Sequence, residues 1–165
     1  TKDYVGESAR VEIITGSDQV TLVEIHDPHM VGTVGFDLGL VGILSRHIIS
    51  YILKATNANS IVHLLWDKAV TPELIAELQA KYQVVTVKPC AIVCVIGSNI
   101  AIPGVLARAA QAMAEAKVNV NCISQTLRQV NMQFLVDRED YKPAIIALNR
   151  ALCLPSRAFV PLGCE

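Results

Sequence analysis

The chain has 165 residues, of which 52% are hydrophobic and 18% are charged, and its formal net charge at pH 7 is −1. This composition is typical of a folded globular protein and excludes a disordered one. A net charge near zero argues against a nucleic-acid partner or a membrane-surface partner, and no apolar run approaches the ~20 residues that a membrane-spanning helix needs.

The N-terminal segment "TKDYVGESAR" lacks the charged-then-apolar pattern of a signal peptide, so we expect residues 1–9 to be a linker. The next segment, "RVEIIT" (Arg10–Thr15), predicts a strand. Six elements are then expected in the order strand, helix, strand, strand, helix, strand: Val20–Ile25, Gly35–His47, Ile49–Ala55, Ser60–Asp67, Thr71–Tyr82 and Val84–Lys88.

The second half of the chain repeats this order. Its expected elements are Ala91–Ile96, Pro103–Ala116, Val118–Ser124, Val130–Asp137 and Asp140–Leu152. Pro103 stands where a proline is tolerated in the first helical turn. The last segment, "LPSRAFVPLGCE", is too rich in proline to predict a fourth strand with this pattern.

The two halves are copies of one unit. Gly35 matches Gly104 at an offset of 104 − 35 = 69, and Asp67 matches Asp137 at an offset of 137 − 67 = 70. Each copy reads βαββαβ, so the expected fold class is α+β, with two ferredoxin-like units of antiparallel sheet and helices on one face. The spare strand Val11–Thr15 is expected to complete the second sheet. The expected domains are residues 18–89 and residues 90–153, the latter completed by residues 10–16.

The cysteines and histidines predict no disulfide or metal site. Five cysteines form no C-x-x-C pair, and Cys94 and Cys122 lie in apolar runs, so we expect buried thiols in a reducing cytoplasm. The four histidines lack the spacing of metal ligands, and no metal is expected.

The segment "DPHMVGTVGFDLGLVGIL" (Asp27–Leu44) joins a strand to a helix and contains no lysine, arginine or nucleophile. A phosphatase-like site would need an arginine in this loop, and an RNA reader would need aromatic residues on its central strands. A helix N-terminus can instead hold a carboxylate by its N–H groups, and glycine lets the backbone approach a ligand. The alternative is that Gly35 only permits a tight turn.

The second strand of such a unit is an edge strand. The segment "IISYILKA" is apolar on both faces, with Ile49, Tyr51 and Leu53 expected on one and Ile52 on the other. An exposed apolar edge invites pairing, so we expect dimerisation here. Cover by the strand's own domain is the alternative.

The sequence resembles the tandem ACT domains of aspartokinase regulatory regions over about Arg10 to Cys153. The residues that carry this resemblance are Met30, Gly35 and Phe36, the helix start at Pro103–Val105, and "VNVNCISQ". The resemblance implies a regulatory fragment without catalytic residues, which binds an amino acid effector (lysine or threonine) and controls a kinase domain of the parent chain. The parent kinase would phosphorylate aspartate with ATP and magnesium, towards lysine, threonine and methionine. No cofactor is implied for this chain itself.

The resemblance also implies the effector-binding positions, which lie at the loop and helix start, on the second strand and after it: Met30, Thr33, Gly35, Phe36, Asp37, Ser50, Tyr51, Ile52, Thr56 and Asn57. The second copy offers another candidate interface at Asn119, Asn121 and Gln125. Lysine-sensing members of the family carry an acid in the second strand, where this chain has Ile52, followed by Lys54. Asp37 could supply that charge, or could serve only the helix dipole. A ligand-free dimerisation module and an ACT regulator of another enzyme remain alternatives.

Overall fold

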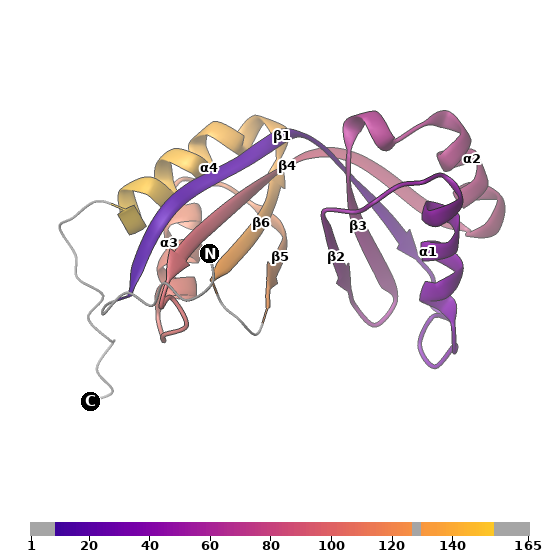
Figure 1. Ribbon diagram of the computed structural model, residues 1–165, viewed down its shortest axis with the longest axis horizontal. Coiled ribbons are helices and arrows are strands. Elements are labelled where there is room, and N and C mark those ends of the chain that lie inside the picture. Colours follow the sequence, from indigo (N-terminus) through magenta and orange to yellow (C-terminus); the bar gives the residue numbers. More distant parts are fainter. Residues whose placement is uncertain (1–8, 127–129, 154–165) are drawn as a thin grey trace. The chain divides into compact units, whose positions relative to one another are not determined.

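The computed structural model describes residues 9–126 and 130–153 and shows a mixed α+β fold (Figure 1). The linker expected at residues 1–9 lies outside the described residues except for Ala9, as does the proline-rich end from residue 154. The strand order is β2-β3-β1-β4-β6-β5, which places β2 and β5 at the edges. The described residues cluster into two compact units.

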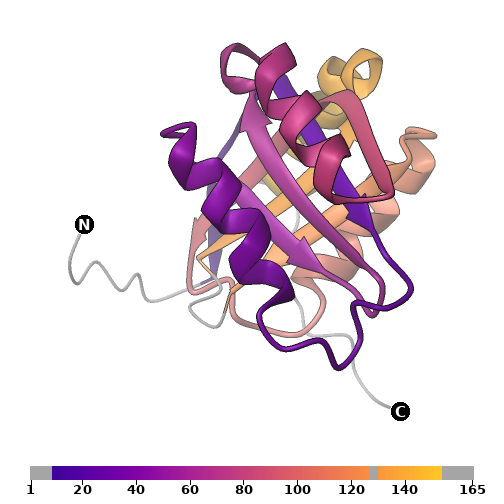
Figure 2. The same cartoon turned by 90° about the vertical axis from the view of Figure 1, so that its right-hand side faces the viewer.

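The first unit is Gln19–Cys90. Its sheet contains β2 (Leu53–Thr56), β3 (Ser60–Trp66) and parts of β1 (Arg10–His26) and β4 (Val84–Ser98). Helices α1 (Phe36–Arg46) and α2 (Pro72–Lys81) lie side by side on one face of these strands (Figure 2). Thr71 caps α2, because its Oγ1 accepts a hydrogen bond from the Leu74 backbone N–H at 3.3 Å.

The second unit takes the segment ending at Asp18 and the segment starting at Ala91. It contains the remaining parts of β1 and β4, together with the edge pair β5 (Val120–Gln125) and β6 (Asn131–Asp137). Helices α3 (Val105–Glu115) and α4 (Tyr141–Leu148) pack against the same core. Val11 of β1 is buried in this core with Phe134 and Met113. The α+β class with antiparallel ferredoxin-like units is thus confirmed.

Each unit has a core on the helix-bearing face of its sheet. The core of the first unit consists of Val23, Ile25, Met30, Leu40, Ile43, Leu44, Ile61, Leu65, Leu74, Leu78 and Tyr82. In β3, the core residues Ile61 and Leu65 alternate with residues of the opposite face, so His63 between them also points to the core side.

The expected strand breaks in β1 and β4 were wrong. Val11–Thr15 and Val20–Ile25 belong to one strand, β1, and Val84–Lys88 and Ala91–Ile96 belong to one strand, β4. Gly16 continues β1 because the backbone comes so close to β4 that a Cβ atom would lie 2.0 Å from the Ile92 carbonyl oxygen. Pro89 continues β4 because in the first unit this strand is an outer one, where a missing N–H is tolerated.

Three helix and strand boundaries also differ from expectation. The strand expected at Ile49–Ala55 begins only at Leu53, because the chain after α1 is still completing the helix end. Pro103 precedes the helix rather than entering its first turn, since Gly104 is the N-cap of α3. The helix expected at Asp140–Leu152 is a 3-10 turn (Arg138–Asp140), then α4, then a π-helical turn at Asn149–Cys153.

At the third strand of each copy, the offset between corresponding residues is one larger than the 70 expected from the sequence. Strands β3 and β6 correspond at an offset of 131 − 60 = 71, so Asp67 corresponds to Arg138 and not to Asp137. At this offset, His63 corresponds to Phe134. The expected burial of two cysteines was also wrong in degree: Cys94 and Cys122 are half-buried, and burial raises the pKa of both thiols.

Candidate functional site

The loop before α1 is held by its own short-range hydrogen bonds. Asp27 Oδ1 accepts from the His29 backbone N–H at 2.8 Å, and Thr33 Oγ1 donates to the His29 carbonyl at 2.6 Å. Gly35 is the N-cap of α1 with φ +79°, and no side chain caps the helix. A Cβ atom at Gly35 would meet nothing within 4 Å, so this backbone faces open space in the chain. The start of α1 is therefore uncapped and accessible.

The predicted residues of this loop and helix start lie in different environments. Met30 is only 9% exposed and belongs to the core of the first unit. Thr33 and Gly35 are exposed. Phe36 is half-buried, with its ring centroid 5.5 Å from that of Tyr82. The exposed backbone, and not the Met30 side chain, is thus the part of this loop that a ligand can reach.

Asp37 is paired within its own chain. Lys54 Nζ on β2 donates a 2.5 Å hydrogen bond to Asp37 Oδ2 on the first turn of α1. Asp37 Oδ1 is buried and has no hydrogen-bond partner. The carboxylate therefore lies at the helix N-terminus, as the dipole favours, but its charge is also balanced by Lys54.

His63 lies directly behind this ion pair. It is opposite Lys54 in the β2–β3 register and is 1% exposed, and neither ring nitrogen has a hydrogen-bond partner. Burial, and to a smaller extent the positive charge of Lys54, lower the His63 pKa to about 4 against the opposing charge of Asp37. The imidazole is accordingly neutral at neutral pH.

Tyr82, which follows α2, is the fourth polar residue in this region, beside Asp37, Lys54 and His63. Its hydroxyl is buried without a hydrogen-bond partner and lies 3.1 Å from the position that a Cβ atom would take at Gly39 in α1. Burial raises the pKa of Tyr82, and the nearby charge of Asp37 raises it further. We call Asp37, Lys54, His63 and Tyr82 the polar cluster.

The sequence predictions included only Asp37 of this cluster as a site residue. A signal for His63 was present, because it alternates with Ile61 and Leu65 on a strand whose buried face is otherwise apolar. Nothing in the local sequence marks Lys54 or Tyr82, whose proximity to Asp37 depends on how β2 and α2 pack around α1.

Tyr51 connects the polar cluster to a surface groove. Its ring packs edge-on against His63, with centroids 5.0 Å apart and the planes at 76°. Tyr51 therefore lies on the same side of the sheet as His63. Leu53 lies opposite Leu64 and points to the other side, so the expectation that Tyr51 and Leu53 share a face was wrong. Ile52 is half-buried, and its backbone N–H donates to the Leu64 carbonyl at 2.8 Å.

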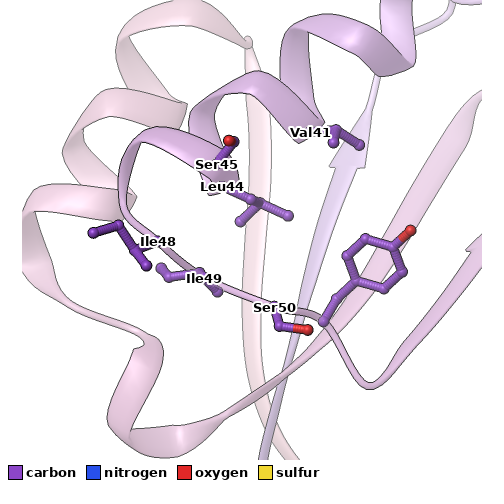
Figure 3. Close-up of a pocket in the computed structure, with 7 residues that line it drawn as sticks. Val41, Leu44, Ser45, Ile48, Ile49 and Ser50 are labelled. Carbon is purple, nitrogen blue, oxygen red and sulfur yellow. The ribbon is translucent and has the colours of Figure 1, made fainter.

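The groove has a volume of about 630 Å³ and runs between the C-terminal half of α1 and the chain that follows it. Figure 3 shows Val41, Leu44 and Ser45 on the helix, and Ile48, Ile49 and Ser50 on the segment below it. The predicted residues Ser50 and Tyr51 both line this groove. Its lining combines apolar side chains with those of Ser45, Ser50 and Tyr51, which carry hydroxyls.

The remaining predicted residues lie away from the polar cluster's contacts. Thr56 and Asn57 are exposed at the β2–β3 turn, where Asn57 Oδ1 accepts from the Ala58 backbone N–H at 2.7 Å. In the second unit, Asn119 donates to Asn121 Oδ1 at 3.2 Å, and Asn121 donates to Asp137 Oδ1 at 2.7 Å. Gln125 is exposed at the end of β5.

Within the described ranges, no three His, Cys, Asp or Glu side chains gather closely enough to hold a metal ion. None of the helices described is sufficiently long and apolar to cross a membrane.

Residues 93–152 match the family model of the ACT domain. The chain is 37% identical over 158 residues to the aspartate kinase Ask_Ect of Stutzerimonas stutzeri strain A1501, which covers 94% of this chain and 33% of that protein. The chain thus spans about a third of the length of the curated relative it matches.

Solved structures of aspartate kinases have the same fold. E. coli aspartokinase III, determined with aspartate and ADP, superposes with a TM-score of 0.79 at 26% identity, over 91% of this chain and 35% of that one. The regulatory subunit of aspartate kinase from Thermus flavus superposes with a TM-score of 0.73 at 16% identity, over 86% of this chain and 98% of the subunit. The resemblance to aspartokinase regulatory regions is therefore confirmed: the chain aligns with about a third of the aspartate kinases and with nearly the whole of the Thermus flavus subunit.

Proposed function

We propose that this chain is the amino-acid-sensing region of an aspartate kinase, and that the first unit holds a free amino acid between the start of α1 and the segment around Tyr51. The regulatory role rests on the relatives described above, and the effector is our proposal. One observation carries it: α1 begins at an exposed, left-handed Gly35 without a side-chain cap, beside buried polar atoms that have no partner.

The physical basis is the field at the helix start. Free N–H groups and the positive end of the helix dipole bind a carboxylate without a basic side chain. Tyr51 lines the groove and packs against His63 of the polar cluster, so the groove gives room for part of a ligand beside the cluster. E. coli aspartokinase III has been crystallised with lysine and aspartate, which supports an amino acid as the class of ligand.

The proposed consequence for the parent protein is feedback control. An amino acid that binds one state of the regulatory region more tightly than another shifts the attached kinase domain towards that state. The kinase would use ATP and magnesium to phosphorylate aspartate, in the biosynthesis of lysine, threonine and methionine.

The chain offers a matched pair of variants to test the sensor. Gly35→Ala and Gly104→Ala place a Cβ at equivalent left-handed N-caps, with φ +79° and +94°, and each should destabilise its unit by roughly 1–2 kcal/mol. A thermal-shift titration of the wild-type chain with L-lysine, L-threonine and L-methionine should raise Tm for at least one of them. Gly35→Ala should lose that ligand-dependent rise, whereas Gly104→Ala should retain it.

The controls separate the sensor from its alternative. If none of these amino acids raises Tm, the chain is not a sensor of the proposed class, and the ligand-free dimerisation module is favoured. Loss of the rise in Gly104→Ala, with retention in Gly35→Ala, would place the site outside the first unit, and Asn119, Asn121 and Gln125 would then be the next residues to change. Equal loss in both glycine variants would contradict a site confined to the first unit.

A second copy of the chain is the partner that we propose for the same region. Exposed apolar residues gather around the start and the end of α1: Val31 (67% exposed), Val34 (100%), Leu38 (75%) and Ile48 (93%). Ile48 also holds a left-handed conformation, φ +57°, which is strained for a β-branched residue.

Light scattering tests this dimer. The chain should have about twice the monomer mass of 17.9 kDa, and Val34→Glu should return it to the monomer. Ile146→Glu, at a half-exposed position of α4 in the second unit, is the control and should leave the dimer intact. A monomeric wild-type chain at all concentrations would contradict the proposal.

A further inference from the structure

The polar cluster is not required by the fold. The helices α1 and α3 correspond at an offset of 105 − 36 = 69, so Asp37 corresponds to Leu106. The strand registers pair Lys54 with His63 in the first unit and Ile123 with Phe134 in the second, so Lys54 corresponds to Ile123 and His63 to Phe134. The second unit therefore builds the same architecture with three apolar residues. A partly buried ion pair gives little net stability over apolar residues of similar size, so its presence in one unit only points to a use other than folding.

The cluster carries no net charge but several free hydrogen-bonding atoms. Lys54 and Asp37 neutralise one another, and the imidazole and phenol are neutral at neutral pH. Asp37 Oδ1, both ring nitrogens of His63 and the Tyr82 hydroxyl have no partner, and they are four of the five such buried atoms among the described residues. His63 and Tyr82 are more than nine-tenths buried, and the Tyr82 hydroxyl faces Gly39 in α1.

The position of Lys54 determines what charge a bound molecule can bring. A side-chain ammonium group of the ligand near Asp37 would meet a carboxylate that is already paired and would lie against the Lys54 ammonium group, which is unfavourable in a partly desolvated site. A side-chain carboxylate of the ligand in the same place would have to displace Asp37 from Lys54. A hydroxyl or amide group would disturb neither charge and could bond to the unpartnered atoms.

We infer that Lys54 is a built-in counter-ion for Asp37 that makes this site select amino acids with an uncharged polar side chain and reject those with a cationic one. This inference rests on the proposed effector site in the first unit and specifies the class of effector. The two charges of the pair act as a filter: removing one should open the site to a ligand that carries the same charge as the residue removed.

The wild-type chain tests the filter without any substitution. Titration calorimetry should give an affinity for L-threonine, and L-lysine should bind at least about tenfold more weakly than L-norleucine, which has the same carbon chain without the side-chain ammonium. A tenfold ratio corresponds to about 1.4 kcal/mol. Equal affinities for L-lysine and L-norleucine would overturn the inference.

Two variants test the residues. Lys54→Met should leave Asp37 unpaired and strengthen L-lysine binding at least about tenfold, whereas Asp37→Asn should leave Lys54 unpaired and favour L-glutamate. Lys81→Met is the matched control, because Lys81 Nζ lies over the Tyr82 ring at 5.4 Å from its centroid and is not paired with Asp37. A gain of L-lysine binding in Lys81→Met as large as that in Lys54→Met would show a general charge effect and overturn the role of Lys54.

The outcomes separate this inference from the proposed function. Binding of amino acids without discrimination between L-lysine and L-norleucine overturns only the charge filter. Absence of binding by any amino acid to wild-type and variant chains overturns both the filter and the effector site.

Discussion

His63 occupies the core position at which the second unit has Phe134, and this single difference has consequences for stability. Phe134 is fully buried and fills the core with hydrocarbon. His63 is equally inaccessible but brings two ring nitrogens that the protein does not satisfy. A buried polar atom without a partner is unfavourable, so the first unit retains His63 at the expense of stability.

The lowered pKa of His63 predicts sensitivity to acid. Its pKa is about 4 in the folded chain, against an ordinary value of 6.5 for histidine. Between these values the unfolded chain binds a proton that the folded chain does not, so the free energy of unfolding should fall as the pH is lowered from about 6.5 to about 4. Urea unfolding at a series of pH values measures this slope.

The variant His63→Phe, which copies Phe134, provides the control. It should be more stable than the wild type at pH 7 by about 1 kcal/mol, because two unsatisfied atoms are removed, and its stability should depend less on pH in this window. An unchanged slope in His63→Phe would assign the acid sensitivity to other groups.

At the scale of elements, α1 and α3 end in the same way. In α1, the Ile49 N–H donates to the Leu44 carbonyl at 2.9 Å and the Ile48 N–H donates to the Ser45 carbonyl at 3.0 Å, which is the Schellman arrangement. In α3, Val118 and Lys117 make the equivalent bonds to Met113 and Ala114. Ile48 and Lys117 accordingly have φ +57° and +59°, a conformation that glycine adopts more readily.

Ile48→Gly should therefore stabilise the isolated chain by about 1 kcal/mol, since the strain of a left-handed β-branched residue is removed. The loss of apolar contact is small because Ile48 is 93% exposed. Lys117→Gly at the equivalent position is the comparison and should also stabilise. Denaturant midpoints measured at concentrations where the chain is monomeric give the values, and a destabilised Ile48→Gly would mean that Ile48 makes contacts beyond its own helix end.

The element scale also shows why local sequence predicts some boundaries and not others. Thr71 before Pro72 marks the start of α2 by capping chemistry, and the structure begins the helix there. The start of β2 is different, because the apolar segment Ile49–Ile52 has strand propensity but is used to close the helix end and line the groove. Propensity cannot distinguish these uses, since both place apolar residues in half-buried positions.

At the scale of the whole molecule, β1 and β4 join the two units covalently as continuous strands. Each strand is 17 or 15 residues long and contributes residues to the sheet of both units. Unfolding of one unit therefore frees part of a strand that the other unit needs, which favours one cooperative transition.

The single tryptophan tests this coupling, because Trp66 lies in the first unit and reports only on it. Phe134→Ala, in the core of the second unit, should destabilise the chain by about 3–5 kcal/mol and shift the Trp66 fluorescence transition together with the circular dichroism transition. A Trp66 transition that stays at the wild-type midpoint would show that the units unfold independently.

The sequence by itself determined the repeat and the α+β class, because these depend on apolar periodicity and on glycines such as Gly35 and Gly104 that recur along the chain. It also carried the resemblance to aspartokinase regulatory regions, through motifs such as the helix start at Pro103–Val105. Only the tertiary structure decided which charges meet. Asp37, Lys54, His63 and Tyr82 are far apart in sequence, and a helix, two strands and the end of a second helix must pack before Lys54 reaches Asp37. Long-range contacts of this kind leave no local pattern, because each residue taken alone is an ordinary helix, strand or loop residue.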